Sequence, residues 1–187
     1  MRYRRGVRIH LRFSFFVFNA LIFLLHDSRL ILGFYTVCAL HEAGHIAAAS
    51  LMGVKLREVE VTGFGIVMKT SAERLCPRRT ELIVLLAGPC ANLLAYAFMK
   101  VGGSGGELAY LELAAAVYNL LPYRQLDGGA LLSLLAEGSE YEDELGRCLA
   151  GVKAGISAVL LVVTLYAGHI AAPLFIASVI LFISEKR

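Results

Sequence analysis

Three ionisable residues stand inside the apolar run "FYTVCALHEAGHIAAASLMG", which covers residues 34–53. They are His41, Glu42 and His45. Residues four apart share one face of a helix, so both imidazoles can bind the same metal ion. Glu42 directly follows His41 and provides the carboxylate of a general base. The HExxH spacing therefore predicts a zinc site with two imidazole ligands and one acid–base group.

The competing interpretation is that these side chains only form hydrogen bonds between helices. Ionisable groups in an apolar segment are costly without a strong partner, and this cost favours a bound cation. Cys38, one helical turn before His41, is a further candidate ligand. We favour a packing role for it, because free cysteine usually acts as a small hydrophobe.

A catalytic zinc ion takes a third protein ligand, and we favour Asp127. Its segment "YNLLPYRQLDGGALLSLL" joins two apolar stretches, and Pro122 interrupts the helix there. Gly128 and Gly129 allow the backbone to turn tightly after Asp127. Broken helices at membrane depth are tolerated where protein or water surrounds them, as at a metal site. The rival carboxylates are those of Glu58, Glu60 and Glu73, while Asp27 and Asp143 are assigned to other loops.

The elements that position these residues are expected to be membrane helices. Of 187 residues, 58% are hydrophobic and 18% are charged, whereas soluble domains carry about 25% charged residues. Mean hydropathy is +0.68, and the apolar residues form long blocks, so we predict an all-α polytopic membrane protein. The net charge of +3 comes with no basic patch typical of nucleic-acid binding. The four cysteines contain no CxxC pair and predict no disulfide.

Six apolar blocks predict about six transmembrane helices. They cover residues 13–25, 30–52, 80–99, 108–121, 154–167 and 170–183. Lysine and arginine concentrate in alternate loops, so the positive-inside rule places both termini in the cytoplasm. The basic N-terminus resembles a signal peptide but lacks a small-residue cleavage site, and we expect a retained first helix.

The loop "VKLREVEVTGFGIVMKTSAE" alternates apolar and polar residues on either side of its central GFG. The pattern predicts a small membrane-associated β-hairpin with strands near Val54–Thr62 and Ile66–Thr70. An ordinary cytoplasmic loop remains the alternative. An open strand edge there would accept an extended peptide by strand addition. The acidic stretch Glu137–Gly146 is expected to be a solvated cytoplasmic loop.

Three motifs resemble those of the site-2 protease family of intramembrane zinc metalloproteases, and they span residues 41–129 in the same order. "HEAGH" is similar to the family's zinc-binding HExxH motif. "AGPCANLL" is similar to its Gly-Pro-x-x-Asn pattern, and "NLLPYRQLDGG" to its Asn-x-x-Pro…Leu-Asp-Gly motif. Within the family, the basic head and the six expected spans most resemble the stage IV sporulation protein FB branch.

The resemblance implies an endopeptidase that cuts a membrane-embedded or membrane-associated protein near the cytoplasmic face. It also implies regulated intramembrane proteolysis, which in that branch means sigma-factor precursor processing during sporulation. One Zn²⁺ per chain would be held by His41, His45 and Asp127, with Glu42 as the base. The implied substrate-binding residues are Asn119, Pro122, Asn92, Gly63 and Phe64.

We therefore expect a single metalloprotease domain over residues 1–187, with its core at 30–136 and neither a PDZ nor a CBS domain. The expected location is the cell membrane, with several spans. The expected partners are lipid, a membrane-tethered protein substrate and a membrane regulatory protein, but no nucleic acid. Two alternatives stay open: a zinc transporter or sensor with the same ligands, and an inactive homologue that retains a client.

Overall fold

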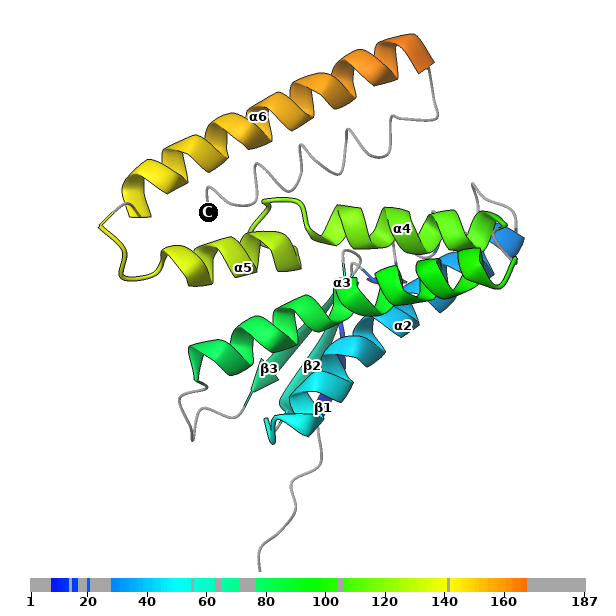
Figure 1. Ribbon diagram of the computed structural model, residues 1–187, viewed down its shortest axis with the longest axis horizontal. Helices are drawn as coiled ribbons and strands as arrows, with labels where there is room; N and C mark the ends of the chain where they lie inside the picture. The colour runs from blue at the N-terminus through cyan, green and yellow to red at the C-terminus, as the bar shows by residue number, and fades with distance from the viewer. Residues whose placement is uncertain are drawn as a thin grey trace, which may run out of the picture. The chain divides into compact units, whose positions relative to one another are not determined.

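The computed structural model describes residues 8–13, 15–16, 20, 28–54, 56–62, 65–70, 77–103, 106–140 and 142–167. The chain forms two compact units, Met1–Ala116 and Val117–Arg187, and each is described by itself. Most of the described residues are helical, and one small sheet accompanies the helices (Figure 1). The mostly helical fold agrees with the fold class predicted from the sequence. The single domain over residues 1–187 stays a prediction.

The first unit contains two long helices, α2 (Ser28–Leu51) and α3 (Arg78–Val101), which pack side by side (Figure 1). They coincide with the apolar blocks predicted at 30–52 and 80–99. Small residues line their contact, since a Cβ atom added at Gly44 would lie 2.5 Å from the Ala87 carbonyl oxygen and 2.9 Å from the Ala91 Cβ. Seams of small residues let two membrane helices bring their backbones close together.

A third helix, α4 (Glu107–Asn119), begins in the same unit and coincides with the block predicted at 108–121. Its Leu111 side chain lies against α2, because a Cβ atom at Gly33 would be 3.2 Å from the Leu111 Cδ1. Side chains from all three helices therefore lie within reach of one another inside this unit.

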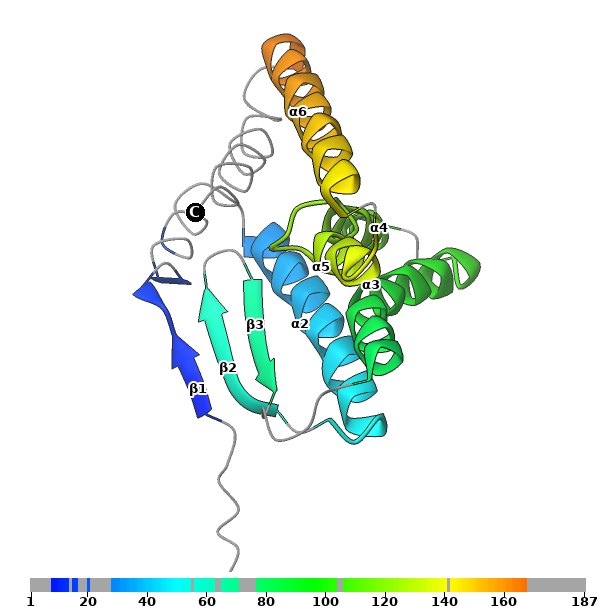
Figure 2. The same ribbon diagram turned by 90° about the vertical axis from the view of Figure 1, so that its left-hand side faces the viewer.

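A three-stranded sheet with the order β1-β2-β3 completes the first unit (Figure 2). The antiparallel pair of β2 (Leu56–Thr62) and β3 (Gly65–Thr70) confirms the predicted hairpin. The strand β1 (Arg8–Leu11) pairs parallel to β2 and was not predicted, because the sequence pattern there indicates only a basic head. Opposite charges accompany this pairing, as the Arg12 guanidinium donates to the Glu60 carboxylate at 3.0 Å.

The second unit contains α5 (Asp127–Ala136) and α6 (Glu142–Ala167), with the turn around Pro122 before them. The turn is tight: a Cβ atom at Gly129 would collide with the Tyr123 carbonyl and lie 2.6 Å from the Arg124 nitrogen. Tyr123 is fully buried, and its hydroxyl lies 3.4 Å from the Ser157 Oγ on α6.

The acidic stretch Glu137–Gly146 is only partly a loop, which corrects the sequence prediction. Its last residues form the first turn of α6, which begins at Glu142. Carboxylates at a helix N-terminus are stabilised by the helix dipole, so an acidic composition does not exclude a helix start.

Among the described residues, two helical stretches are long and apolar enough to cross a membrane, Arg78–Val101 and Gly146–Val163. The predicted span at 13–25 lies mostly outside the described residues, and the span at 170–183 lies wholly outside them. The six spans and the cytoplasmic termini stay predictions.

Candidate metal centre

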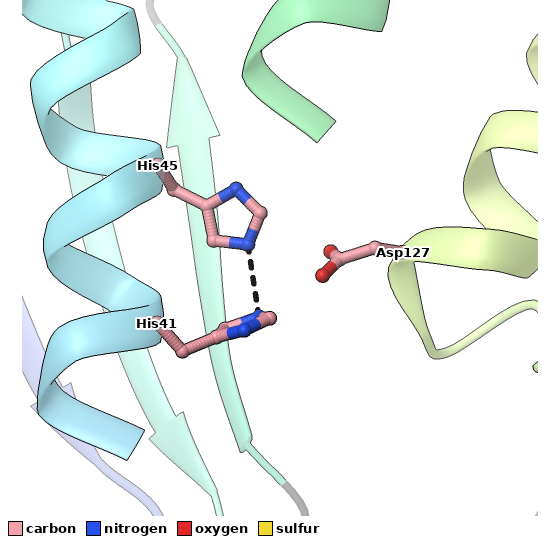
Figure 3. Close-up of side chains that lie close together, drawn as sticks. All are labelled: His41, His45 and Asp127. Carbon is pink, nitrogen blue, oxygen red and sulfur yellow. Dashed lines mark hydrogen bonds between the residues drawn. The ribbon is translucent and has the colours of Figure 1, made fainter. Parts of the chain in front are cut away.

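The two predicted imidazole ligands meet on one face of α2. His41 and His45 are both buried, with 6% and 7% of their surface exposed. Their rings stand edge to face, and the Nε2 atoms lie 3.1 Å apart (Figure 3). The one-turn spacing of the motif produces this arrangement, as predicted from the sequence. Figure 3 also labels Asp127, at the start of α5.

The outer nitrogen of each ring is held by an oxygen that can only accept a hydrogen bond. The His41 Nδ1–H donates to the Asn92 Oδ1 at 2.7 Å. The His45 Nδ1–H donates to the Val84 carbonyl oxygen, also at 2.7 Å. Both neutral rings are therefore Nδ1-protonated, and both Nε2 atoms present lone pairs. The two Nε2 atoms lie 3.1 Å apart, close enough for one metal ion to bind both.

The Asn92 amide has one orientation that satisfies all its neighbours. Its Nδ2 donates to the Val37 carbonyl at 3.2 Å and to the Glu112 Oε2. Both are acceptors, so the nitrogen must face them and the oxygen must face His41. Asn92 and Glu112 are buried almost completely, with 0% and 1% of their surface exposed. A buried network therefore fixes the tautomer and the ring direction of His41.

The backbone of α3 makes room for this pair. Gly88 lies directly against the two rings, because a Cβ atom there would be 2.6 Å from the His45 Cε1 and 2.8 Å from the His41 Cε1. Asn92 follows one turn later on the same face. The Gly-Pro-x-x-Asn pattern thus combines a space for imidazole with a hydrogen-bond acceptor for it.

The Val84 carbonyl lies on α3, one turn before Gly88. A carbonyl oxygen has two lone pairs, so it can accept the His45 Nδ1–H at 2.7 Å in addition to a helical hydrogen bond. Pro89 lacks the N–H that would bond the Leu85 carbonyl, so the helical hydrogen bonds are interrupted at the neighbouring residue.

The donor chemistry and the spacing of the pair fit zinc. Two nitrogens bound to a tetrahedral zinc ion at about 2.05 Å lie about 3.3 Å apart. The observed separation of 3.1 Å between the Nε2 atoms is close to this value. Ligating histidines in zinc proteins also usually donate their second N–H to a protein acceptor, as both rings do here.

The remaining predicted residues occupy defined places. Glu42 lies on α2 directly after His41 and is half-buried. Asp127 is the first residue of α5 in the second unit and is half-buried, while Asn119 ends α4 and Pro122 lies in the turn between these helices. Gly63 and Phe64 lie outside the described residues.

The rival carboxylates are engaged elsewhere or lie outside the described residues. The Glu58 carboxylate is 3.3 Å from the His10 Nε2 on β1, and the Glu60 carboxylate is 3.0 Å from the Arg12 guanidinium. Glu73 lies outside the described residues. The two described rivals thus lie beside basic side chains of β1 and of the residue that follows it.

Sequence reasoning missed Glu112. It stands alone as an acidic residue in the apolar block at 108–121, and an ionisable residue in such a block is by itself a sign of function. The role of Asn92 was predicted as substrate binding. Its substrate contact stays a prediction, and the structure adds that its side chain holds His41.

Comparison with known proteins gives relatives among metalloproteases, although no family model matches the chain. The chain is 27% identical to stage IV sporulation protein FB of Bacillus subtilis over 137 residues, which cover 69% of this chain and 48% of that protein. It is 28% identical to a putative zinc metalloprotease of Synechocystis, over 49% of this chain and 27% of that protein. A zinc metalloprotease of Methanocaldococcus jannaschii is 29% identical over 68% of this chain and 42% of that protein.

The chain thus spans less than half the length of these curated relatives. Among solved structures, the fold is similar to that of the site-2 protease from Methanocaldococcus jannaschii, with a TM-score of 0.68. That similarity covers 98% of this chain and 91% of the other at 21% identity, and it concerns the fold alone.

Proposed function

Because the chain belongs to the site-2 protease family of zinc metalloproteases, we propose that it is an intramembrane zinc endopeptidase. Its substrate would be a membrane-embedded or membrane-tethered protein, cut near the cytoplasmic face. One observation carries the proposal: two buried imidazoles, each with its Nδ1 hydrogen-bonded to a protein oxygen, place their Nε2 atoms 3.1 Å apart.

The zinc ligands in this proposal are His41, His45 and Asp127. Together they offer two imidazole nitrogens and one carboxylate oxygen, a donor set that suits a catalytic zinc ion. Asp127 begins α5 directly after an extended Leu126, and Gly128 and Gly129 permit the tight turn that this position needs. These local features support a fixed position for the Asp127 carboxylate at the start of α5.

When bound, zinc would act as a Lewis acid that makes water nucleophilic at neutral pH and polarises the carbonyl group of the peptide bond to be cut. Glu42 accepts the proton of the attacking water and passes it to the nitrogen of the leaving amine as the peptide C–N bond breaks. Asn92 and Val84 keep the imidazoles oriented throughout. Burial of the two imidazoles limits access of bulk water to their lone pairs.

Substrate binding is assigned to the loops and strands around this centre. A helical substrate hides its carbonyl groups in internal hydrogen bonds, so it must become extended before cleavage. Asn119 and Pro122 would contact the extended stretch, and the hairpin with Gly63 and Phe64 would align it by strand addition. These four assignments rest on the family's motifs and on the observed hairpin.

The biological setting belongs to the same proposal. Similarity to stage IV sporulation protein FB supports a membrane-associated precursor protein as client, including a sigma-factor precursor in sporulation. Several membrane spans, a location in the cell membrane and a membrane-bound regulatory partner follow from this setting. The two apolar helical stretches among the described residues support the membrane location.

The decisive experiment compares wild type with Glu42→Gln, each co-expressed with a panel of membrane-tethered candidate substrates. The glutamine side chain has the same shape but cannot act as a base, so we expect zinc content to stay at the wild-type level while cleavage falls at least 100-fold. Cleavage by the variant at the wild-type rate would show that Glu42 is not the base. If the wild-type protein binds no zinc, the proposed function itself fails.

A further inference from the structure

We propose that Glu112 is a positioning residue of the metal centre and acts on His41 through the Asn92 amide. The inference rests on the proposed function, because it assigns a role toward the same zinc site. Glu112 lies on α4, within an otherwise apolar block, with only 1% of its surface exposed. A carboxylate in such a place is costly, so a defined role explains its presence better than chance does.

The contacts form a continuous line from the carboxylate to the imidazole. Glu112 Oε2 accepts a hydrogen bond from the Asn92 Nδ2, and the Asn92 Oδ1 accepts one from the His41 Nδ1–H. All three side chains are buried, so water cannot replace either hydrogen bond. The line joins helices α4, α3 and α2 within the first unit.

The direction of the two hydrogen bonds gives the line its electrostatic effect. A negative carboxylate beside the Asn92 N–H polarises the amide, and the amide oxygen then holds the imidazole N–H more strongly. A stronger hydrogen bond at Nδ1 makes the opposite nitrogen, Nε2, a better electron-pair donor. Carboxylate–histidine–zinc triads work in this way, and here an amide is inserted between the carboxylate and the imidazole.

A purely structural role makes a different prediction. If Glu112 only filled space and occupied the Asn92 Nδ2, then glutamine, which is isosteric and keeps an acceptor oxygen, would replace it without loss. If its charge matters, Glu112→Gln weakens zinc binding although the fold is retained. Zinc affinity therefore distinguishes the space-filling role of Glu112 from the role of its charge, whereas the stability of the fold does not.

The test measures zinc affinity of the purified full chain in detergent, by competition with a chelator of known affinity. We expect Glu112→Gln to raise the dissociation constant for zinc about 10-fold, since loss of such an outer partner typically costs 10–100-fold. Glu112→Met, which removes the buried carboxylate entirely and keeps an apolar side chain of similar length, provides a second variant and should raise it at least as much. The matched control is Glu107→Gln, an exposed position on the same helix, with affinity unchanged.

A double-mutant cycle tests whether Asn92 transmits the effect. In an Asn92→Ala background, Glu112→Gln should change the dissociation constant less than twofold, because the connection is already broken. Thermal unfolding of the metal-free proteins checks that the fold persists. Wild-type affinity in both folded Glu112 variants, or an undiminished Glu112 effect after Asn92→Ala, would overturn the inference and leave the proposed function standing. Absence of zinc binding by wild type would instead refute the proposed function.

Discussion

Gly88→Ala is the substitution that most directly tests the geometry of the imidazole pair. The added Cβ atom would lie 2.6 Å from the His45 Cε1, whereas ordinary contacts begin at 3.4 Å, so the groups must separate by at least 0.8 Å. Metal–ligand distances tolerate deviations of about 0.2 Å. A displacement of this size exceeds that tolerance, and a misplacement of about 1 Å at an active site can lower the rate about 100-fold.

We therefore expect Gly88→Ala to weaken zinc binding and cleavage by at least about 100-fold while the helices remain. Zinc affinity by chelator competition and helix content by circular dichroism measure the two effects separately. Gly151→Ala is the matched control, because a Cβ atom at this helical glycine of α6 has no neighbour within 4 Å among the residues that the structure describes. Zinc affinity within twofold of wild type in Gly88→Ala would refute the description of the site.

Three further predictions test the metal centre and the packing of the second unit. Asn92→Ala removes the acceptor of the His41 proton and should weaken zinc binding about 10–100-fold, as measured by the same chelator competition. Tyr123→Phe removes a hydroxyl that lies 3.4 Å from the Ser157 Oγ, and it should lower the free energy of unfolding by about 0.5–1.5 kcal/mol in a denaturant titration; an equal loss in a Ser157→Ala background would show that this contact is not the cause. Treatment with 1,10-phenanthroline should stop cleavage, and added zinc should restore it, whereas activity that survives complete metal removal would contradict the zinc mechanism.

The helices and the histidine pair were predictable because they depend on local patterns. Long apolar blocks fix where α2, α3 and α4 lie, and the spacing of His41 and His45 alone brings their rings to one face. The hairpin was predictable for the same reason, since its alternation and its glycines act over a few residues.

The missed features depend on contacts between distant segments. The sequence does not show that β1 pairs with β2, because the pairing joins residues 8–11 to residues about fifty positions later. Likewise, Glu112 gains its role only when three helices meet and place it beside Asn92. Its charge in an apolar block was the available signal, but a partner could not be identified without the fold.

The parallel pairing of β1 with β2 has a practical consequence for any assay. An affinity tag or reporter fused to the N-terminus lies only seven residues from β1, which begins at Arg8, so a bulky or folded fusion there can pull on the hairpin. Differences in turnover between tagged preparations would then reflect the fusion and not the chemistry of the centre. A short unstructured spacer before Arg8 separates the two effects.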